Sequence, residues 1–323
     1  MKRIIFLQLL CAIAVVANAI DVNEIRIRDP FVYADPTDNT YYLYRASSTP
    51  EGFGGVEVLT SKDLKTWTDP VNVLALPADN WLTGPIWAPE MHKVGDKYYI
   101  FATVNGDVIW KREHEGRKYE MRGTQIFVAD SPKGPFKAFD DRLPATPVGQ
   151  MCLDGTYFHD RGKHYMIFCH EWVELRDGTI EAVELTPDLQ HTVGNPIRLF
   201  CGSAPEWSTG RTDDGMGRYY VTDGNFLYRS PKSGKLFMIW SSFINDDYAL
   251  GVAESLTGHV TGPWKQIDTP LVKSNSGHGM IFKDFSGNLW IALHGPNSPS
   301  GAERLKLLPL VDDGDSLKLK QAH

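Results

Sequence analysis

The sequence predicts an all-β fold, specifically a five-bladed β-propeller. A hairpin of two aromatic-rich strands occurs five times along the chain, and the 29 glycines and 20 prolines are scattered, which suits many turns between short strands. Helical periodicity is nearly absent, which argues against a helical or α/β fold. Four strand signals recur in each repeat of roughly 55 to 70 residues, a spacing typical of propeller blades. A β-sandwich with coincidental turn spacing is the alternative.

Each hairpin consists of a strand, a short polar turn and a second strand rich in Tyr, Phe, Ile and Trp. The five hairpins occupy residues 28–45, 86–101, 153–169, 221–240 and 277–293. A second pair of strand signals follows the first four hairpins, at residues 56–67, 124–136, 179–189 and 249–264. Strands bounded by Gly, Pro, Asn and Asp clusters in this way predict four-stranded antiparallel sheets.

The fifth repeat is short, with strand signals only at 305–310 and 317–319 after its hairpin. We expect the N-terminal segment 22–27 to supply a missing strand and close the ring, because closure removes exposed sheet edges. The sequence contains no linker or low-complexity run, so we predict that residues 20–323 form one domain.

The N-terminus has the pattern of a secretory signal peptide. Lys2 and Arg3 precede an apolar stretch at 4–17, and a small-residue cleavage pattern ends at Ala19. The stretch is shorter than a membrane-spanning helix requires. We therefore expect cleavage of residues 1–19, a secreted or periplasmic protein and no membrane insertion.

Charge and cysteine content exclude some classes of protein. The net charge of −7 gives no general attraction to nucleic acid or anionic lipid. Three cysteines follow the expected cleavage site, at positions 152, 169 and 201. An odd, sparse count does not predict a disulfide framework. Cys152 and Cys169 flank one hairpin, so they are either a pair or two buried thiols.

Carboxylates recur on the first strand of the blades. In a propeller these strands line the central channel, so residues distant in sequence converge there. Asp29, Glu90, Asp154 and Asp223 lie on such strands, and Asp223 is predicted to share its place in the repeat with Asp29 and Asp154. Asp-Gly turns would be the ordinary explanation for two of them. Convergent carboxylates otherwise indicate a cation site or acid–base chemistry.

The chain resembles glycoside hydrolase family 43, the five-bladed arabinofuranosidases, xylosidases and arabinanases. The matching pieces are Arg-Asp-Pro at 28–30, Trp-Ala-Pro-Glu at 87–90, Leu-Asp-Gly-Thr at 153–156, and Gly-His-Gly at 277–279 followed by His294. The resemblance implies a hydrolase that cleaves arabinofuranosyl or xylosyl linkages of plant cell-wall polysaccharides with inversion. It also implies three carboxylates, namely a base, an acid and a third that orients the acid, with no required cofactor.

Carried over by position, Asp29 resembles the general base and Asp154 the orienting carboxylate. The acid departs from the family pattern, which usually has Glu before Gly-Pro at the start of blade four. This chain has Asp223 followed by Gly and Asn, and Asp is one methylene shorter than Glu. Glu206, in a preceding loop, is the second candidate. If neither residue donates the proton, activity would be weak or absent.

Three further residues are candidates for substrate binding. Trp87 either stacks on a sugar or packs between blades. Arg45 either contacts a sugar hydroxyl or a catalytic carboxylate, or lies at the surface. The resemblance places His278 near the channel centre, where it would lie beside a cation such as calcium held mainly by waters. A hydrogen-bonded core histidine is the alternative, since one histidine cannot form a closed metal site.

Two other functions remain open from the sequence. One is a related propeller hydrolase that acts on fructosides, retains configuration and uses its first-blade Asp as a nucleophile. The other is a non-catalytic carbohydrate-binding propeller, which the altered acid position suggests. Release of reducing sugar from arabinan, xylan and levan separates these possibilities.

Overall fold

The computed structural model describes residues 19–48, 54–76, 85–114, 117–139, 143–213, 215 and 217–320. Residues 1–18, which make up nearly all of the expected signal peptide, lie outside this part of the chain. Within it, no helix has both the length and the apolar character needed to cross a membrane.

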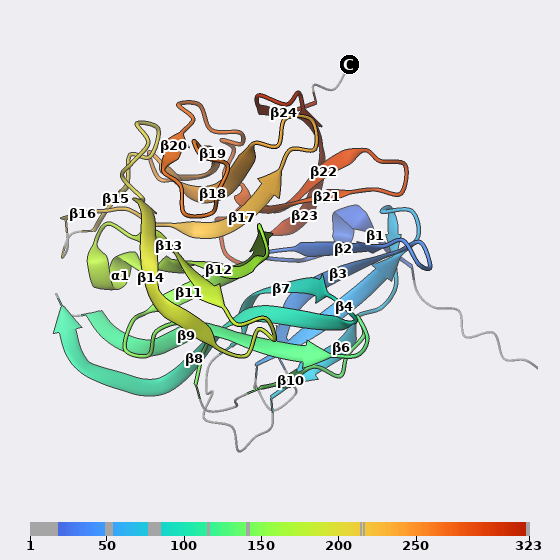
Figure 1. Ribbon diagram of the computed structural model, residues 1–323, viewed down its shortest axis with the longest axis horizontal. Helices are drawn as coiled ribbons and strands as arrows, with labels where there is room; N and C mark the ends of the chain where they lie inside the picture. Colours follow the sequence, from blue (N-terminus) through green and yellow to red (C-terminus); the bar gives the residue numbers. More distant parts are fainter. Residues whose placement is uncertain are drawn as a thin grey trace, which may run out of the picture.

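Five four-stranded antiparallel sheets follow one another in chain order around a central axis (Figure 1). We call them blades I to V, and their inner strands are β2 (Phe31–Asp35), β7 (Trp87–Val94), β11 (Cys152–Asp160), β17 (Asp223–Arg229) and β21 (Gly277–Lys283). The second strands, which complete the hairpins, are β3 (Thr40–Ser48), β8 (Lys97–His114), β12 (Lys163–His170), β18 (Leu236–Ile244) and β22 (Leu289–Gly295). The prediction of an all-β, five-bladed propeller is confirmed.

Two outer strands complete each sheet. The third strands are β4 (Gly54–Ser61), β9 (Arg117–Ala129), β13 (Thr179–Leu185), β19 (Asp247–Ser255) and β23 (Arg304–Asp312). The fourth are β6 (Val71–Ala75), β10 (Lys137–Ala138), β14 (Thr192–Cys201), β20 (Trp264–Gln266) and β24 (Leu317–Leu319). Buried aromatic side chains such as Trp240 and Phe101 fill the space between blades, where close packing contributes much of the stability of the fold.

The prediction that segment 22–27 supplies a strand to blade V is wrong. Blade V takes all four strands from its own repeat, because the short segment at β24 pairs with β23. Val22–Glu24 forms a 3-10 helix (η1) instead, and only β1 (Ile20–Asp21) pairs with another strand, the two-residue β5 (Thr66–Trp67) near blade I. Blades V and I still meet, since the amide of Val32 in β2 donates to the Met280 sulfur in β21 at 3.5 Å. The N-terminal segment also reaches blade V, where the Leu305 amide donates to the Ile25 carbonyl at 3.1 Å. The ring therefore closes by contacts between neighbouring blades and this segment, and not by a shared sheet.

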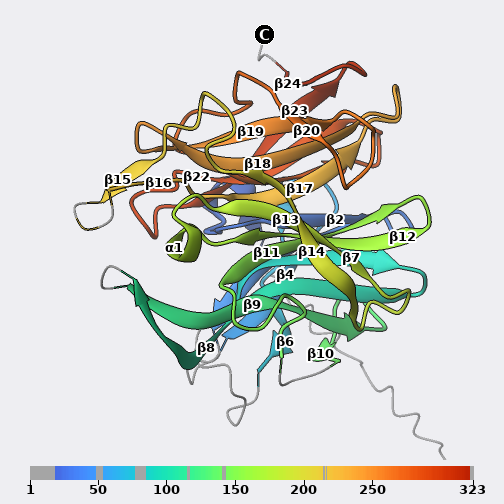
Figure 2. The ribbon, with the colours of Figure 1, turned by 60° about the vertical axis from the view of Figure 1, so that its left-hand side comes forward.

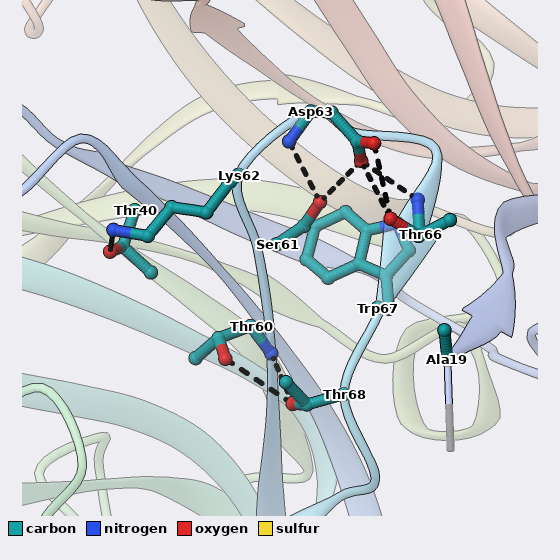
Figure 3. A pocket seen from close by; sticks show the side chains of 9 residues that line it. All are labelled: Ala19, Thr40, Thr60, Ser61, Lys62, Asp63, Thr66, Trp67 and Thr68. Atoms are coloured by element: carbon teal, nitrogen blue, oxygen red, sulfur yellow. Dashed lines mark hydrogen bonds between the residues drawn. The ribbon is translucent and has the colours of Figure 1, made fainter. Parts of the chain in front are cut away.

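The N-terminal strand borders a shallow pocket of about 310 Å³ at the outer end of blade I (Figure 3). Asp63 orders the adjacent turn by accepting hydrogen bonds from the amides of Lys65 and Thr66, each at 2.8 Å. Thr40, which also lines the pocket, pairs with Asp35, so this pocket lies at the end of β2 opposite to Asp29.

Three additions project on one side of the propeller. They are the long ends of β8 and β9, the four-residue helix α1 (Trp172–Leu175) after β12, and the small hairpin of β15 (Arg211–Asp213) and β16 (Gly217–Tyr219). Figures 1 and 2 both show them on the left-hand side. Because α1 follows directly on the end of β12 that pairs with the start of β11, this side is where the inner strands of the blades begin.

Candidate active site

The inner strands begin with the same backbone irregularity. In β7, β11, β17 and β21 the pairing with the second strand shifts across two residues, and the first of the two has a positive φ. In blade I the equivalent residue lies two positions before β2. The five residues are Asp29, Ala88, Asp154, Gly224 and His278, with φ between 42° and 54°. Residues other than Gly rarely adopt this left-handed backbone conformation, and such backbone strain concentrates at functional sites.

This register corrects the expected position of Asp223. Asp223 pairs with Ser241 before the irregularity, as Leu153 pairs with Cys169 in blade III. Gly224, not Asp223, therefore matches Asp29 and Asp154. The two Asp-Gly pairs align in sequence, but the bulge of blade IV falls one residue later. Asp223 thus approaches the channel from a different backbone position than the other two aspartates.

His278 joins the three predicted aspartates into one cluster. Its Nδ1 lies 3.0 Å from Asp29 Oδ1, 3.0 Å from Asp223 Oδ1 and 3.9 Å from Asp154 Oδ2. The side chains of Asp154 and His278 are 6% and 7% exposed, and those of Asp29 and Asp223 are 13% and 22% exposed. Burial acts to lower the pKa of His278, but the carboxylates outweigh it and raise that pKa to about 10. His278 is therefore a cation that holds carboxylates together.

Asp154 and Asp223 differ in protonation state. Burial raises the pKa of Asp154 well above its usual value, and the negative charge of Asp223 adds to this. Burial also opposes ionisation of Asp223, but hydrogen bonds from His278 and from the Tyr248 hydroxyl, the latter at 2.6 Å, lower its pKa overall. Asp154 is consequently the protonated partner and Asp223 the ionised one.

Asp29 lies between two histidines of blade V with opposite roles. Its backbone amide donates to His294 Nδ1 at 3.2 Å, and His294 Nε2 donates to Asn297 Oδ1 at 3.2 Å. His294 is fully buried, and burial lowers its pKa, so it is a neutral imidazole. Among the described residues, the nitrogens near the Asp29 carboxylate approach Oδ1. Oδ2 is therefore available to a water molecule in the channel.

A cavity of about 330 Å³ opens over this cluster. Its lining residues are Arg28, Asp29, Trp87, Leu153, Asp154, Glu171, Trp172, Val221, Thr222 and Asp223. Two residues further along their inner strands, Phe31 and Phe226 pack with ring centroids 6.3 Å apart. The cavity is large enough to hold a sugar ring against the aspartates.

Sequence reasoning missed Glu171 and Trp172. Glu171 follows the last residue of β12 and is the N-cap residue of α1, and its side chain is 5% exposed. Trp172 stacks on Tyr219 of β16 with centroids 4.0 Å apart. The signal for both was a Glu-Trp pair directly after an inner hairpin, on the side of the molecule where the other site residues lie.

Arg122 of β9 holds one wall of the cavity. Its Nη1 donates to Glu171 Oε1, and its Nε donates to Asn105 Oδ1 at 2.7 Å. Its guanidinium also lies over the ring of Trp87, 4.4 Å from the centroid. Burial raises the pKa of Glu171, and the charge of Arg122 opposes that shift. Trp87 thus lines the cavity and is positioned by a cation–π contact, while its stacking on a sugar stays a prediction.

The other predicted residues lie apart from the aspartate cluster. Arg45 pairs with Glu57 at 3.0 Å and borders a neighbouring cavity of about 430 Å³ that shares Arg28, Asp29 and Trp87 with the first. Glu206 is exposed in a turn and does not line the aspartate cavity.

Glu90 and the cysteines have structural contacts. Glu90 Oε2 accepts a hydrogen bond from the Thr156 hydroxyl at 2.5 Å, within the layer below the cluster. The thiols of Cys152, Cys169 and Cys201 are free, and the first two are buried. The Cys169 thiol donates to Asn225 Oδ1 at 3.1 Å.

Asp154, Asp223 and His278 each offer one ligand atom, and these atoms lie within 4.8 Å of one another. A cation bound by all three groups would have to replace the proton that His278 Nδ1 shares with the carboxylates. Ca²⁺ takes about six to eight oxygen ligands, so two carboxylates and one imidazole would leave most of its ligands to water. The hydrogen-bonded arrangement satisfies the same three groups without an ion.

We expect stability to fall as pH rises because of His170, which precedes Glu171. Its ring nitrogens contact Glu174 at 2.9 Å and Glu181 at 3.3 Å, and its side chain is 8% exposed. Burial acts to lower its pKa, but the two carboxylates raise it to about 9. Its contribution is therefore complete below pH ~6.5 and is lost as pH rises through about 9, at up to ~1.4 kcal/mol per pH unit.

Urea unfolding at several pH values between 7 and 9 tests this expectation. The free energy of unfolding of the native chain should fall more steeply with pH than that of His170→Gln, which cannot bind the extra proton. Parallel pH profiles for the two proteins would contradict it.

Comparison with known proteins agrees with this geometry. The model of the family "Glycosyl hydrolases family 43" matches residues 21–309. The endo-arabinase structure from Bacteroides thetaiotaomicron VPI-5482 is 38% identical, with a TM-score of 0.81, covering 91% of this chain and 98% of that one. An extracellular exo-α-(1→5)-L-arabinofuranosidase from Streptomyces chartreusis is 25% identical over 76% of this chain and 70% of its own length.

A xylan β-1,4-xylosidase structure from Bacillus halodurans C-125 shares the fold, with a TM-score of 0.65 at 18% identity, covering 94% of this chain and 56% of that one. The region that the family model matches, residues 21–309, contains all five inner strands and every aspartate of the cluster. With these aspartates gathered under a sugar-sized cavity and a family match over most of its length, the chain belongs to glycoside hydrolase family 43 and is a glycosidase.

Proposed function

We propose that this glycosidase cleaves arabinofuranosyl linkages of plant cell-wall polysaccharides with inversion, using three or more carboxylates of one cavity. The observation that carries the proposal is the placement of Asp29, Asp154 and Asp223 around His278 at the floor of that cavity. The endo-arabinase, at 38% identity, favours arabinose over xylose as the sugar. Xylosyl linkages are the second candidate.

In the proposed reaction, Asp29 acts as the general base. A water molecule attacks the anomeric carbon while Asp29 Oδ2 takes its proton, and the bond from that carbon to the leaving oxygen breaks as a second group protonates this oxygen. Asp154 and Asp223, with His278, fix the electrostatic environment of Asp29.

The same proposal includes export of the protein. The basic, apolar and small-residue pattern of positions 1–19 supports a secreted or periplasmic enzyme. A polysaccharide substrate outside the cell is consistent with such a location. Mass determination of the protein from culture medium or periplasm would show whether the chain begins at Ile20.

An activity panel tests the proposal. We expect release of arabinose or arabino-oligosaccharides from linear arabinan, and hydrolysis of an aryl α-L-arabinofuranoside faster than an aryl β-D-xyloside. Proton NMR during the first turnovers should show a product of inverted anomeric configuration. A product of retained configuration, or cleavage of levan in preference to arabinan, would contradict the proposal and favour the fructoside-cleaving mechanism.

A further inference from the structure

We propose that Glu171, at the junction of β12 and α1, is the proton donor of this active site. The proposal rests on the proposed function and names the residue that protonates the leaving oxygen. Glu171 lies outside the repeat positions that hold the aspartates, yet it lines the same cavity as they do.

Asp223 is not free to donate a proton. Both of its oxygens accept hydrogen bonds, Oδ1 from His278 at 3.0 Å and Oδ2 from Tyr248 at 2.6 Å. Its Oδ1 and Asp29 Oδ1 contact the same imidazole nitrogen, so they lie no more than about 6 Å apart, below the ~6.5–9.5 Å that separates acid from base in inverting enzymes. The imidazole of His278, and not a sugar with its attacking water, stands between these two oxygens.

Asp154, although protonated, has both carboxyl oxygens engaged in contacts. Its Oδ1 contacts the Thr103 hydroxyl at 3.4 Å, and its Oδ2 accepts from the Gly224 amide at 3.1 Å. Its own amide donates to the same Thr103 hydroxyl at 2.8 Å. These contacts hold Asp154 in the floor of the site, as expected for a group that shifts the pKa values of neighbouring carboxyl groups.

The two oxygens of the Glu171 carboxyl have different surroundings. Its Oε1 is bound by Arg122, while its Oε2 is buried and has no hydrogen-bond partner among the described residues. Leaving a buried oxygen without a hydrogen-bond partner costs about 1–3 kcal/mol of stability. We account for this cost by assigning Oε2 the proton that passes to the substrate oxygen. The backbone is fixed by the Glu171 amide, which donates to the Met151 carbonyl at 2.8 Å.

Atoms balance in the resulting step. Glu171 Oε2 gives its proton to the glycosidic oxygen, the bond from the anomeric carbon to that oxygen breaks, and water adds to the carbon and loses a proton to Asp29. Release of the leaving sugar then leaves Glu171 ionised beside Arg122 and Asp29 protonated. Proton exchange with solvent resets both carboxyl groups.

Leaving-group dependence tests the assignment. We expect Glu171→Gln to lose about 10²–10⁴-fold in kcat on arabino-oligosaccharides, but less than tenfold on a 2,4-dinitrophenyl arabinofuranoside, whose leaving group needs no proton. The alkaline limb of the kcat/KM profile should also disappear. Asp223→Asn is the matched control and should lose similar factors on both substrates, because its role is electrostatic.

The outcomes separate this assignment from the proposed function. Equal losses on both substrates in Glu171→Gln, or the selective loss in Asp223→Asn, would overturn the role of Glu171 alone. A native enzyme that hydrolyses none of the arabinosides and xylosides would contradict the proposed function and, with it, this assignment. If Glu171→Gln does not fold, Glu171→Asp retains the charge facing Arg122, withdraws the donating oxygen by one methylene and must show the same selective loss.

Discussion

Asp29→Asn is expected to reduce kcat/KM on an aryl arabinofuranoside by about 10²–10⁴-fold, because an amide cannot accept the proton of the attacking water. The substitution keeps the shape of the side chain. It also keeps the backbone, since Asn, like Asp, tolerates the left-handed conformation that position 29 adopts at φ 51°. The loss should appear with good and poor leaving groups alike, since attack by water is common to both.

Asp35→Asn is the matched control for Asp29→Asn. Asp35 ends the same strand, is 4% exposed and accepts hydrogen bonds from Thr37, but it lies at the opposite end of β2 from the cavity. The Asp35→Asn enzyme should keep its activity within about twofold of the native rate even if its stability falls. Initial rates together with thermal unfolding curves measure both effects. An Asp29→Asn enzyme within tenfold of the native rate would remove Asp29 from the mechanism.

The fold could be predicted from the sequence because each blade repeats its own local signals. Aromatic strands, polar turns and the spacing of the five hairpins specify the sheets without reference to distant residues. Closure of the ring could not be predicted, because it depends on which edges meet in space. The short strand Leu317–Leu319 completes blade V, and Ile20 pairs beside Trp67, although the sequence of segment 22–27 is equally compatible with a strand.

The active site likewise contains residues that the sequence could locate and residues that it could not. Asp29 and Asp154 could be located from their position in the repeat, and His278 from the family resemblance. The position of Asp223 could not, since a bulge that falls one residue later changes which backbone atom faces the channel. Glu171 carries no repeat signal at all. Its importance comes from burial beside Arg122 and from an oxygen without a partner among the described residues, and both are properties of the folded chain.

Gly224→Ala is expected to destabilise the protein by several kcal/mol and to abolish most of its activity. Gly224 has φ +53°, and a Cβ there would lie 2.6 Å from His278 Cγ and 2.8 Å from His278 Cα. The second atom is backbone, so the clash cannot be relieved by rotating a side chain. Strand β21 must shift, and His278 would then move away from Asp29 and Asp223. The Gly224 amide, which donates to Asp154, would move with it.

Gly234→Ala provides a control with the same backbone strain and no clash. Gly234 lies in the turn of the same blade at φ +77°, and a Cβ added there would meet no described atom within 4 Å. That variant should lose about 1–2 kcal/mol, the cost of a left-handed alanine, and keep its activity. Urea unfolding and kcat on arabinan measure both proteins. The difference between them isolates the packing of Gly224 against His278, and equal stability losses with native activity in both would show that this contact does not position the catalytic carboxylates.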